Sequence, residues 1–73
     1  MNAIFEMTME NGNIITTELT NILLEEIDGV VVIHADNGFM CNIIRDELVN
    51  EFHDEQKDVY EYADGTKYII ELN

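Results

Sequence analysis

The chain has 73 residues, of which 47% are hydrophobic, and its 16 Asp and Glu against three Lys and Arg give a formal net charge of −13. This length predicts a single domain, residues 1–73, whose own core is only marginally large enough, so that homo-oligomerisation would enlarge it. Three cations exclude nucleic-acid binding through a basic patch. The absence of Ser and the single Cys exclude a Ser nucleophile, iron–sulfur clusters and Cys-based zinc sites.

The chain begins with the pattern of a half-buried strand, because apolar side chains alternate with polar ones from Phe5 to Met9. The segment ENGN at 10–13 follows this strand, and ADNG at 35–38 and ADGT at 63–66 repeat the same kind of signal. Asn-Gly and Asp-Gly between apolar runs predict hairpins, since both central positions of a type I′ turn need positive φ. Each of these segments is therefore expected to join two strands.

A helix is expected after the first hairpin, because the next apolar residues fall at helical spacing. The residues with this spacing are Leu19, Ile22, Leu23 and Ile27. Thr17 stands where an N-cap is needed, and Gly29 lies just past the end of the stripe, where helices often end. This pattern predicts the first of two helices.

The middle of the chain predicts a second hairpin. The segment GVVVI at 29–33 is apolar on both faces, which suits a central strand. The segment FMCNII at 39–44 fits either the return strand of this hairpin or an N-terminal extension of the following helix. Cys, Asn and paired Ile are mediocre helix formers, so the strand is favoured.

A shorter apolar stripe of Leu48, Val49 and Phe52 predicts the second helix, with Asp46 as its cap. From Tyr68 to Leu72 apolar residues alternate again, which predicts a last strand. The expected order is ββαββαββ. The predicted fold class is therefore α+β, a small domain with an antiparallel sheet of hairpins and two short helices.

Candidate catalytic and metal sites are few. His34 and Cys41 flank the middle turn, and a Cys–His pair is the minimum for thiol catalysis. A small buried thiol beside a strand histidine is the simpler interpretation. His53, Asp54 and Glu55 have oxygen and nitrogen ligands for a cation but lack the alternating ligands of a calcium loop. The sequence thus predicts no enzyme, no dedicated metal site and no cofactor.

The carboxylates are the remaining candidates for function. The main group is expected on the solvent side of the second helix and beyond its end, and it consists of Glu47, Glu51, Asp54, Glu55, Asp58 and Glu61, while a second patch consists of Glu18, Glu25 and Glu26. Like charges at i, i+4 cost roughly 0.2–0.5 kcal/mol each when exposed. Anions near a helix C-terminus are disfavoured by about 0.3–1 kcal/mol. Because this placement opposes stability in both ways, a role in binding is as well supported as a merely solvated face.

Such carboxylates would lie about 5–6 Å apart on successive helical turns, or about 6.5–7 Å apart on one face of a strand. These spacings approximate those of neighbouring phosphates along a nucleic-acid strand. In size, charge and strand–helix make-up, the chain is similar to phage-encoded DNA-mimic inhibitors such as uracil-DNA glycosylase inhibitors, anti-restriction proteins and some anti-CRISPR proteins. This resemblance is one of class and carries no motif. It implies a non-enzymatic inhibitor or modulator whose partner is a basic protein, foremost a nucleic-acid-binding enzyme.

Two alternatives remain at this point. The first is a homo-oligomeric structural or accessory domain, a homodimer for example, whose acidity only keeps it soluble. The second is an immunity protein or antitoxin that neutralises a basic toxin by the same electrostatics. The start of the chain has no basic n-region and no segment reaches the length of a membrane span, so the expected location is the cytoplasm of a bacterium or of a phage-infected host.

Overall fold

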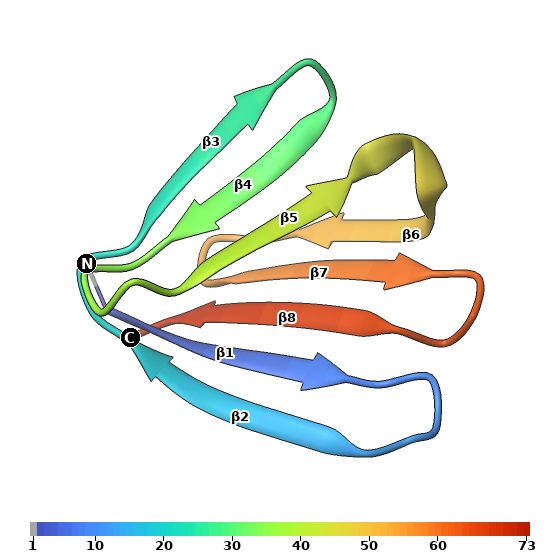
Figure 1. Ribbon diagram of the computed structural model, residues 1–73, viewed down its shortest axis with the longest axis horizontal. Coiled ribbons are helices and arrows are strands. Elements are labelled where there is room, and N and C mark those ends of the chain that lie inside the picture. Colours follow the sequence, from blue (N-terminus) through green and yellow to red (C-terminus); the bar gives the residue numbers. More distant parts are fainter. Residues whose placement is uncertain (1) are drawn as a thin grey trace.

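The chain folds into strands joined by short turns in the computed structural model of Figure 1, which describes residues 2–73. The strands are β1 (Ala3–Thr8), β2 (Ile14–Leu19), β3 (Leu23–Ile27), β4 (Val30–His34), β5 (Met40–Ile44), β6 (Leu48–His53), β7 (Lys57–Tyr62) and β8 (Lys67–Leu72). One short 3₁₀ helix, η1 (Arg45–Glu47), lies between β5 and β6. Within residues 2–73 no residue is in an α-helix, and no helix is long and apolar enough to cross a membrane.

The strands form two antiparallel sheets, one of five strands in the order β2-β1-β8-β7-β6 and one of three in the order β3-β4-β5. Every hydrogen-bonded pair is consecutive in the chain except β1 and β8, which bring the two ends together. The N–H of Asn73 donates to the carbonyl of Asn2 at 3.1 Å, and the start of β1 and the end of β8 lie at the same side of the molecule in Figure 1.

The core forms between the two sheets, because each strand places alternate side chains on its inner face. The buried residues are Ala3, Phe5, Leu19, Tyr60 and Ile70 from the five-stranded sheet, and Val31, Ile33 and Ile43 from the three-stranded sheet. The ring of Phe39 meets Phe5 edge to face, with their centroids 5.0 Å apart. The small core is therefore shared by both sheets, and neither sheet has a core of its own.

The expected hairpins at 10–13, 35–38 and 63–66 are confirmed, but the expected turn type is wrong. In the first, Gly12 N–H donates to the carbonyl of Met9, and Met9 N–H donates to the carbonyl of Asn13. Only the glycine has positive φ in each of these turns. This is a type I turn with a glycine bulge. Its loop has three residues, one more than the two-residue loop of a type I′ hairpin.

The first predicted helix is wrong. Its residues form the end of β2, a short bend and β3, and Asp28 and Gly29 make a two-residue turn that pairs Ile27 with Val30. Asp28 has φ 51° and Gly29 has φ 79°, as a type I′ turn requires. Helix ends and type I′ turns both select a glycine with positive φ, so Gly29 could not distinguish them.

The second predicted helix is also wrong, so the fold is all-β instead of α+β. Asp46 lies inside η1 and does not cap a helix, since no side chain caps η1. Leu48 is half-buried in β6, whereas Val49 and Phe52 are 59% and 56% exposed and form no buried stripe. The strand favoured for 39–44 is confirmed as β5, and β4 is confirmed as a central strand.

Candidate functional site

The six main candidate carboxylates gather on one hairpin at an edge of the five-stranded sheet. They run from Glu47 in η1 through β6 and its turn to Glu61 in β7. They do not share one face, however. Glu51 lies opposite the buried Tyr60 and therefore on the inner face of the sheet, whereas Glu61 is adjacent to Tyr60 in β7 and points to the other side. The predicted single helical face is thus replaced by two faces of a hairpin.

Arg45 links this hairpin to the three-stranded sheet. Its backbone is held by a hydrogen bond from its own N–H to the carbonyl of Gly29, 3.0 Å long. Its guanidinium donates to both carboxylate oxygens of Glu51, at 3.0 and 2.7 Å, and also binds Glu26 in β3. These two partners raise the pKa of Arg45, foremost through the hydrogen bonds to Glu51. One cation therefore neutralises carboxylates from both sheets.

His53 extends this network along the hairpin. Its Nε2 lies 2.5 Å from Glu51 and its Nδ1 lies 2.6 Å from Asp58 on β7. The pKa of His53 is raised, foremost by the hydrogen bond to Glu51 and then by that to Asp58. The pKa of Glu51 is lowered, foremost by Arg45 and then by His53. The ring of His53 also packs edge to face on Tyr60, whose pKa burial raises to about 12.

This network changes the meaning of three predicted binding residues. Glu26 and Glu51 lie within ion-pair distance of Arg45, and Glu51 and Asp58 lie within ion-pair distance of His53, so a partner would have to compete with these cations for them. Sequence reasoning missed Arg45 and His53 as organisers of this site. A usable signal existed, because Glu51 and His53 are two residues apart and would share one face of a strand. The prediction of a helix concealed that signal.

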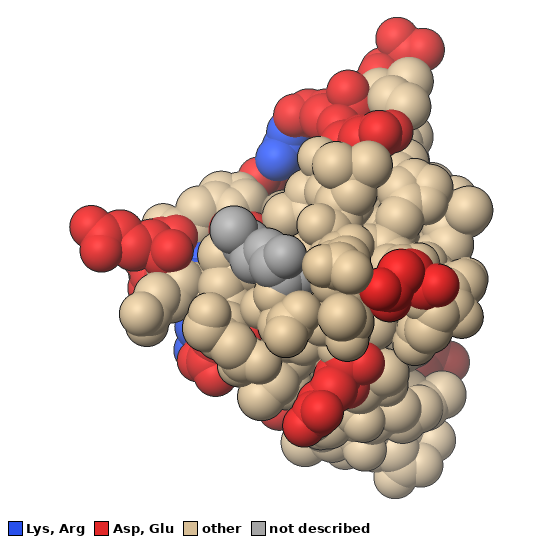
Figure 2. Space-filling view, turned by 90° about the vertical axis from the view of Figure 1, so that its left-hand side faces the viewer, with Lys and Arg blue, Asp and Glu red and all other residues tan. Residues whose placement is uncertain are grey.

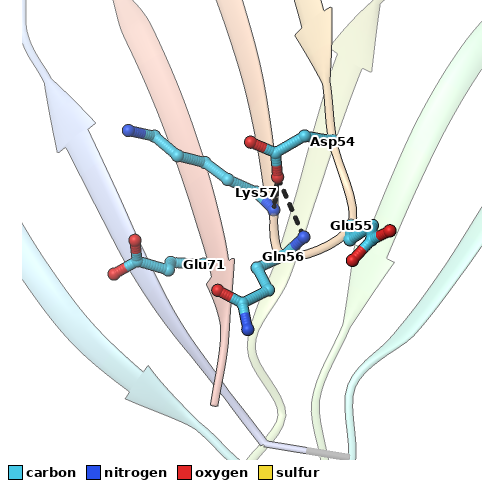
Figure 3. Close-up of a pocket in the computed structure, with 5 residues that line it drawn as sticks. All are labelled: Asp54, Glu55, Gln56, Lys57 and Glu71. Carbon is cyan, nitrogen blue, oxygen red and sulfur yellow. Dashed lines mark hydrogen bonds between the residues drawn. The ribbon is translucent and has the colours of Figure 1, made fainter.

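The turn between β6 and β7 forms a shallow hollow lined by Asp54, Glu55, Gln56, Lys57 and Glu71 (Figure 3). The carboxylate of Asp54 accepts hydrogen bonds from the backbone N–H groups of Gln56 and Lys57, at 2.9 and 2.8 Å. Asp54 thus shapes the turn. In Figure 3, Glu55 extends to the other side of the turn from Glu71, so the carboxylates do not converge on one point.

The other candidates lie apart from one another. Glu61 accepts a hydrogen bond from the amide of Asn50 at 3.1 Å, and Glu47 is exposed in η1. Glu18 is exposed at the end of β2 and Glu25 in β3, so the second patch is divided between the two sheets. Figure 2 shows carboxylates in separate groups around one face of the molecule, with uncharged surface between them.

Two arguments made from the sequence therefore do not hold in this fold. No helix dipole opposes the carboxylates at 51–58, because these residues lie in β6, a turn and β7. The strand β7 also does not carry a regular row of carboxylates spaced like phosphates. Its outer face presents Lys57, Val59 and Glu61 in succession. What remains is a strongly negative surface with irregular spacing.

The possible catalytic pair does not form. His34 pairs with Met40 and Cys41 pairs with Ile33, so the imidazole and the thiol point to opposite faces of the three-stranded sheet. Burial raises the pKa of the Cys41 thiol, which makes the thiolate nucleophile scarcer. In the described range 2–73, no group of three or more His, Cys, Asp and Glu is placed to hold a metal ion.

Comparison with known proteins gives no match: no protein-family model, no curated protein and no solved structure matches this chain.

Proposed function

We propose that the protein is a non-enzymatic binding protein that attaches to a basic partner, foremost a nucleic-acid-binding enzyme, and inhibits or modulates it. One observation supports this proposal. Of the 16 carboxylates, only Glu26, Glu51 and Asp58 form ion pairs in residues 2–73, so most of the charge of −13 is left to act on the surroundings. A field of this size steers a basic partner toward the protein and favours release of the partner's counterions.

The exposed carboxylates of the β6–β7 hairpin are the best candidates for contact. Glu47 and Glu55 are exposed and make no ion pair within the described residues, while Asp54 and Glu61 each keep a hydrogen bond within the hairpin. Glu18 on β2 belongs to a separate area. Because their spacing is irregular, we expect recognition through local ion pairs and the net field, without an imitation of a phosphate row.

The test is affinity capture with the immobilised protein and a bacterial lysate, followed by elution with rising salt and identification of the eluted proteins. We expect one dominant nucleic-acid-binding protein that added DNA also displaces. The immobilised variant Glu47→Gln/Glu55→Gln should capture at least about tenfold less of this partner. The reason is that each close ion pair in a desolvated interface raises the affinity by on the order of a factor of ten.

The matched control is Glu6→Gln/Glu10→Gln, which removes the same charge from β1 and the turn that follows it, where β8 and β7 separate β1 from β6 in the sheet. This control should retain the partner as the wild type does. If both variants lost the same amount of captured partner, net charge alone would account for binding and the hairpin would not be the contact site. If neither salt nor DNA released the captured protein, the proposal would be refuted.

A second candidate function, a homo-oligomeric accessory domain, is favoured by a different observation. Large apolar side chains are exposed on strands that lie at sheet edges, and they are Ile14, Ile15, Leu23, Leu24, Ile27, Met40, Ile44, Val49 and Phe52. Surface of this kind marks interfaces when it is contiguous.

A further inference from the structure

The outer face of the three-stranded sheet is an apolar surface that nothing in residues 2–73 covers. The strand registers place its side chains in three rows across β3, β4 and β5, which are Leu23–His34–Met40, Glu25–Val32–Asn42 and Ile27–Val30–Ile44. The opposite face of the same sheet contains the buried Val31, Ile33 and Ile43. We use the term outer face for these nine residues.

The outer face is more apolar than a solvated sheet face should be. Antiparallel sheets with one face in water usually alternate apolar and polar residues, whereas strands buried on both faces are continuously apolar. The strand β4 is continuously apolar from Val30 to Ile33, yet only its inner face is covered. Met40 is 61% exposed, Ile27 55% and Leu23 54%. This pattern predicts a second layer over the sheet.

The charges of the outer face indicate what the second layer is. It contains one carboxylate, Glu25, and one imidazole, His34, whereas the chain contains 16 carboxylates. A basic partner is attracted to carboxylates and gains little here. Two copies of a chain with a charge of −13 repel each other over most of their surfaces, but this face, with one carboxylate among nine residues, opposes a second copy little.

The rows of the outer face are also complementary to themselves. A twofold axis parallel to β4 places β4 of one copy over β4 of the other and β3 of one over β5 of the other. Leu23 then faces Met40 and Ile27 faces Ile44 of the second copy, and Glu25 faces the amide of Asn42, which can donate to it. An axis at right angles to the strands would place Glu25 against Glu25.

We propose that a second copy of this chain covers the outer face, giving a homodimer in which the two three-stranded sheets pack face to face about this axis. Face-to-face sheets pack about 10 Å apart at roughly −30°, which the axis gives when it is tilted by about 15° from β4. Its four large exposed side chains, Leu23, Ile27, Met40 and Ile44, are 44–61% exposed. With their half-buried neighbours they offer on the order of 500 Å² per copy, so complete burial of the face in a pair covers about 1,000 Å², the lower limit for a specific interface.

The first test is sedimentation of the wild type and of two matched double variants. Met40→Lys/Ile27→Lys changes side chains that are 61% and 55% exposed on the outer face, and Ile14→Lys/Phe52→Lys changes side chains that are 61% and 56% exposed elsewhere. Both variants gain the same two cations. We expect the wild type at twice the chain mass of 8.4 kDa, more completely at high salt because repulsion is screened.

The outer-face variant should dissociate at least about a hundredfold more easily, which is about a factor of ten for each of the two substituted positions. The control variant should stay dimeric. Far-UV circular dichroism of both variants verifies that they remain folded. A wild type that is monomeric at millimolar concentration and high salt refutes the proposal. Equal dissociation of both variants also refutes it.

A second test addresses the orientation of the two copies. Asn42→Glu would place a carboxylate opposite Glu25 of the other copy and should weaken the dimer about tenfold or more at neutral pH. Adding Glu25→Gln to this variant restores an amide–carboxylate pair with the two roles exchanged, and dimerisation should recover. If Glu25→Gln does not restore it, the proposed axis is wrong. The partner capture described above is independent of either result.

Discussion

At the scale of single residues, Arg45 and His53 determine which carboxylates are available. Arg45 binds Glu26 and Glu51, and His53 bridges Glu51 and Asp58. In a chain with so few cations, these contacts relieve repulsion where strands approach one another. Because these groups are partly exposed, each pair alone contributes little to stability. The contacts of His53 with Glu51 and Asp58 nevertheless predict that the stability of the protein depends on pH.

His53→Gln should destabilise the protein in acid more than in base. The pKa of His53 is raised above its ordinary value of 6.5 in the fold, so its contribution is complete below pH 6.5 and is lost as pH rises through the folded pKa. The pKa of Glu51 is lowered from 4.5, so its contribution is complete above pH 4.5 and is lost at lower pH. Thermal melts should therefore show the largest difference between wild type and variant between pH 4.5 and 6.5.

The same titration followed by NMR provides an internal check. The imidazole of His53 should titrate above 6.5 in the folded protein. A pKa of His53 at or below 6.5, or a melting difference that grows with pH, would contradict the network described for Glu51 and Asp58.

At the scale of elements, turn geometry determines the hairpins. Type I turns with a glycine bulge join β1 to β2, β4 to β5 and β7 to β8, whereas a type I′ turn at Asp28 and Gly29 joins β3 to β4. The tighter turn fixes the register of β3 on β4. That register is what places Leu23, Glu25 and Ile27 on the outer face.

Gly29→Ala should destabilise the protein by about 1–2 kcal/mol, because an L residue with positive φ is strained. A Cβ at this position would meet no atom within 4 Å, so the cost comes from the backbone alone. For a domain of this size the melting temperature should fall by roughly 4–16 °C. Asp28→Asn is the matched control, since Asn tolerates the same backbone conformation, and it should change the melting temperature little. A neutral Gly29→Ala would contradict the type I′ turn.

At the scale of the whole molecule, a small shared core opposes a large charge. The molecule extends over 29 × 29 × 24 Å, and the screening length is about 30 Å at 0.01 M salt but only about 3 Å at 1 M. At low salt, every carboxylate therefore repels every other one across the molecule. Salt should relieve this repulsion more than it weakens the few ion pairs.

The melting temperature should accordingly rise with sodium chloride from about 0.01 to 1 M, with most of the change below about 0.2 M, where the screening length falls from the size of the molecule to less than half of it. The measurement needs two protein concentrations, because dimerisation adds a dependence on concentration. A melting temperature that falls with salt at both concentrations would mean that ion pairs outweigh repulsion.

The sequence by itself determined three of the hairpin turns, though not their type, and the first and last strands of the chain. It also determined the exclusion of a Ser nucleophile and of Cys-based metal sites, and the excess of negative charge. These features are local or compositional: Asn-Gly and Asp-Gly signal turns wherever they occur between apolar runs, and the missing Ser and the single Cys are facts of composition.

Only the tertiary structure decided that 19–27 and 46–53 are not helices, that Glu51 and Asp58 face inward, and that His34 and Cys41 point apart. Short apolar stretches with spacings of three and four residues fit a helix and a bent strand pair equally well, and pairing with neighbouring strands resolves them. Strand pairing also determines the face of each side chain, because a shift of one residue reverses it. The inner and outer faces on which both proposals depend could not be assigned before that register was known.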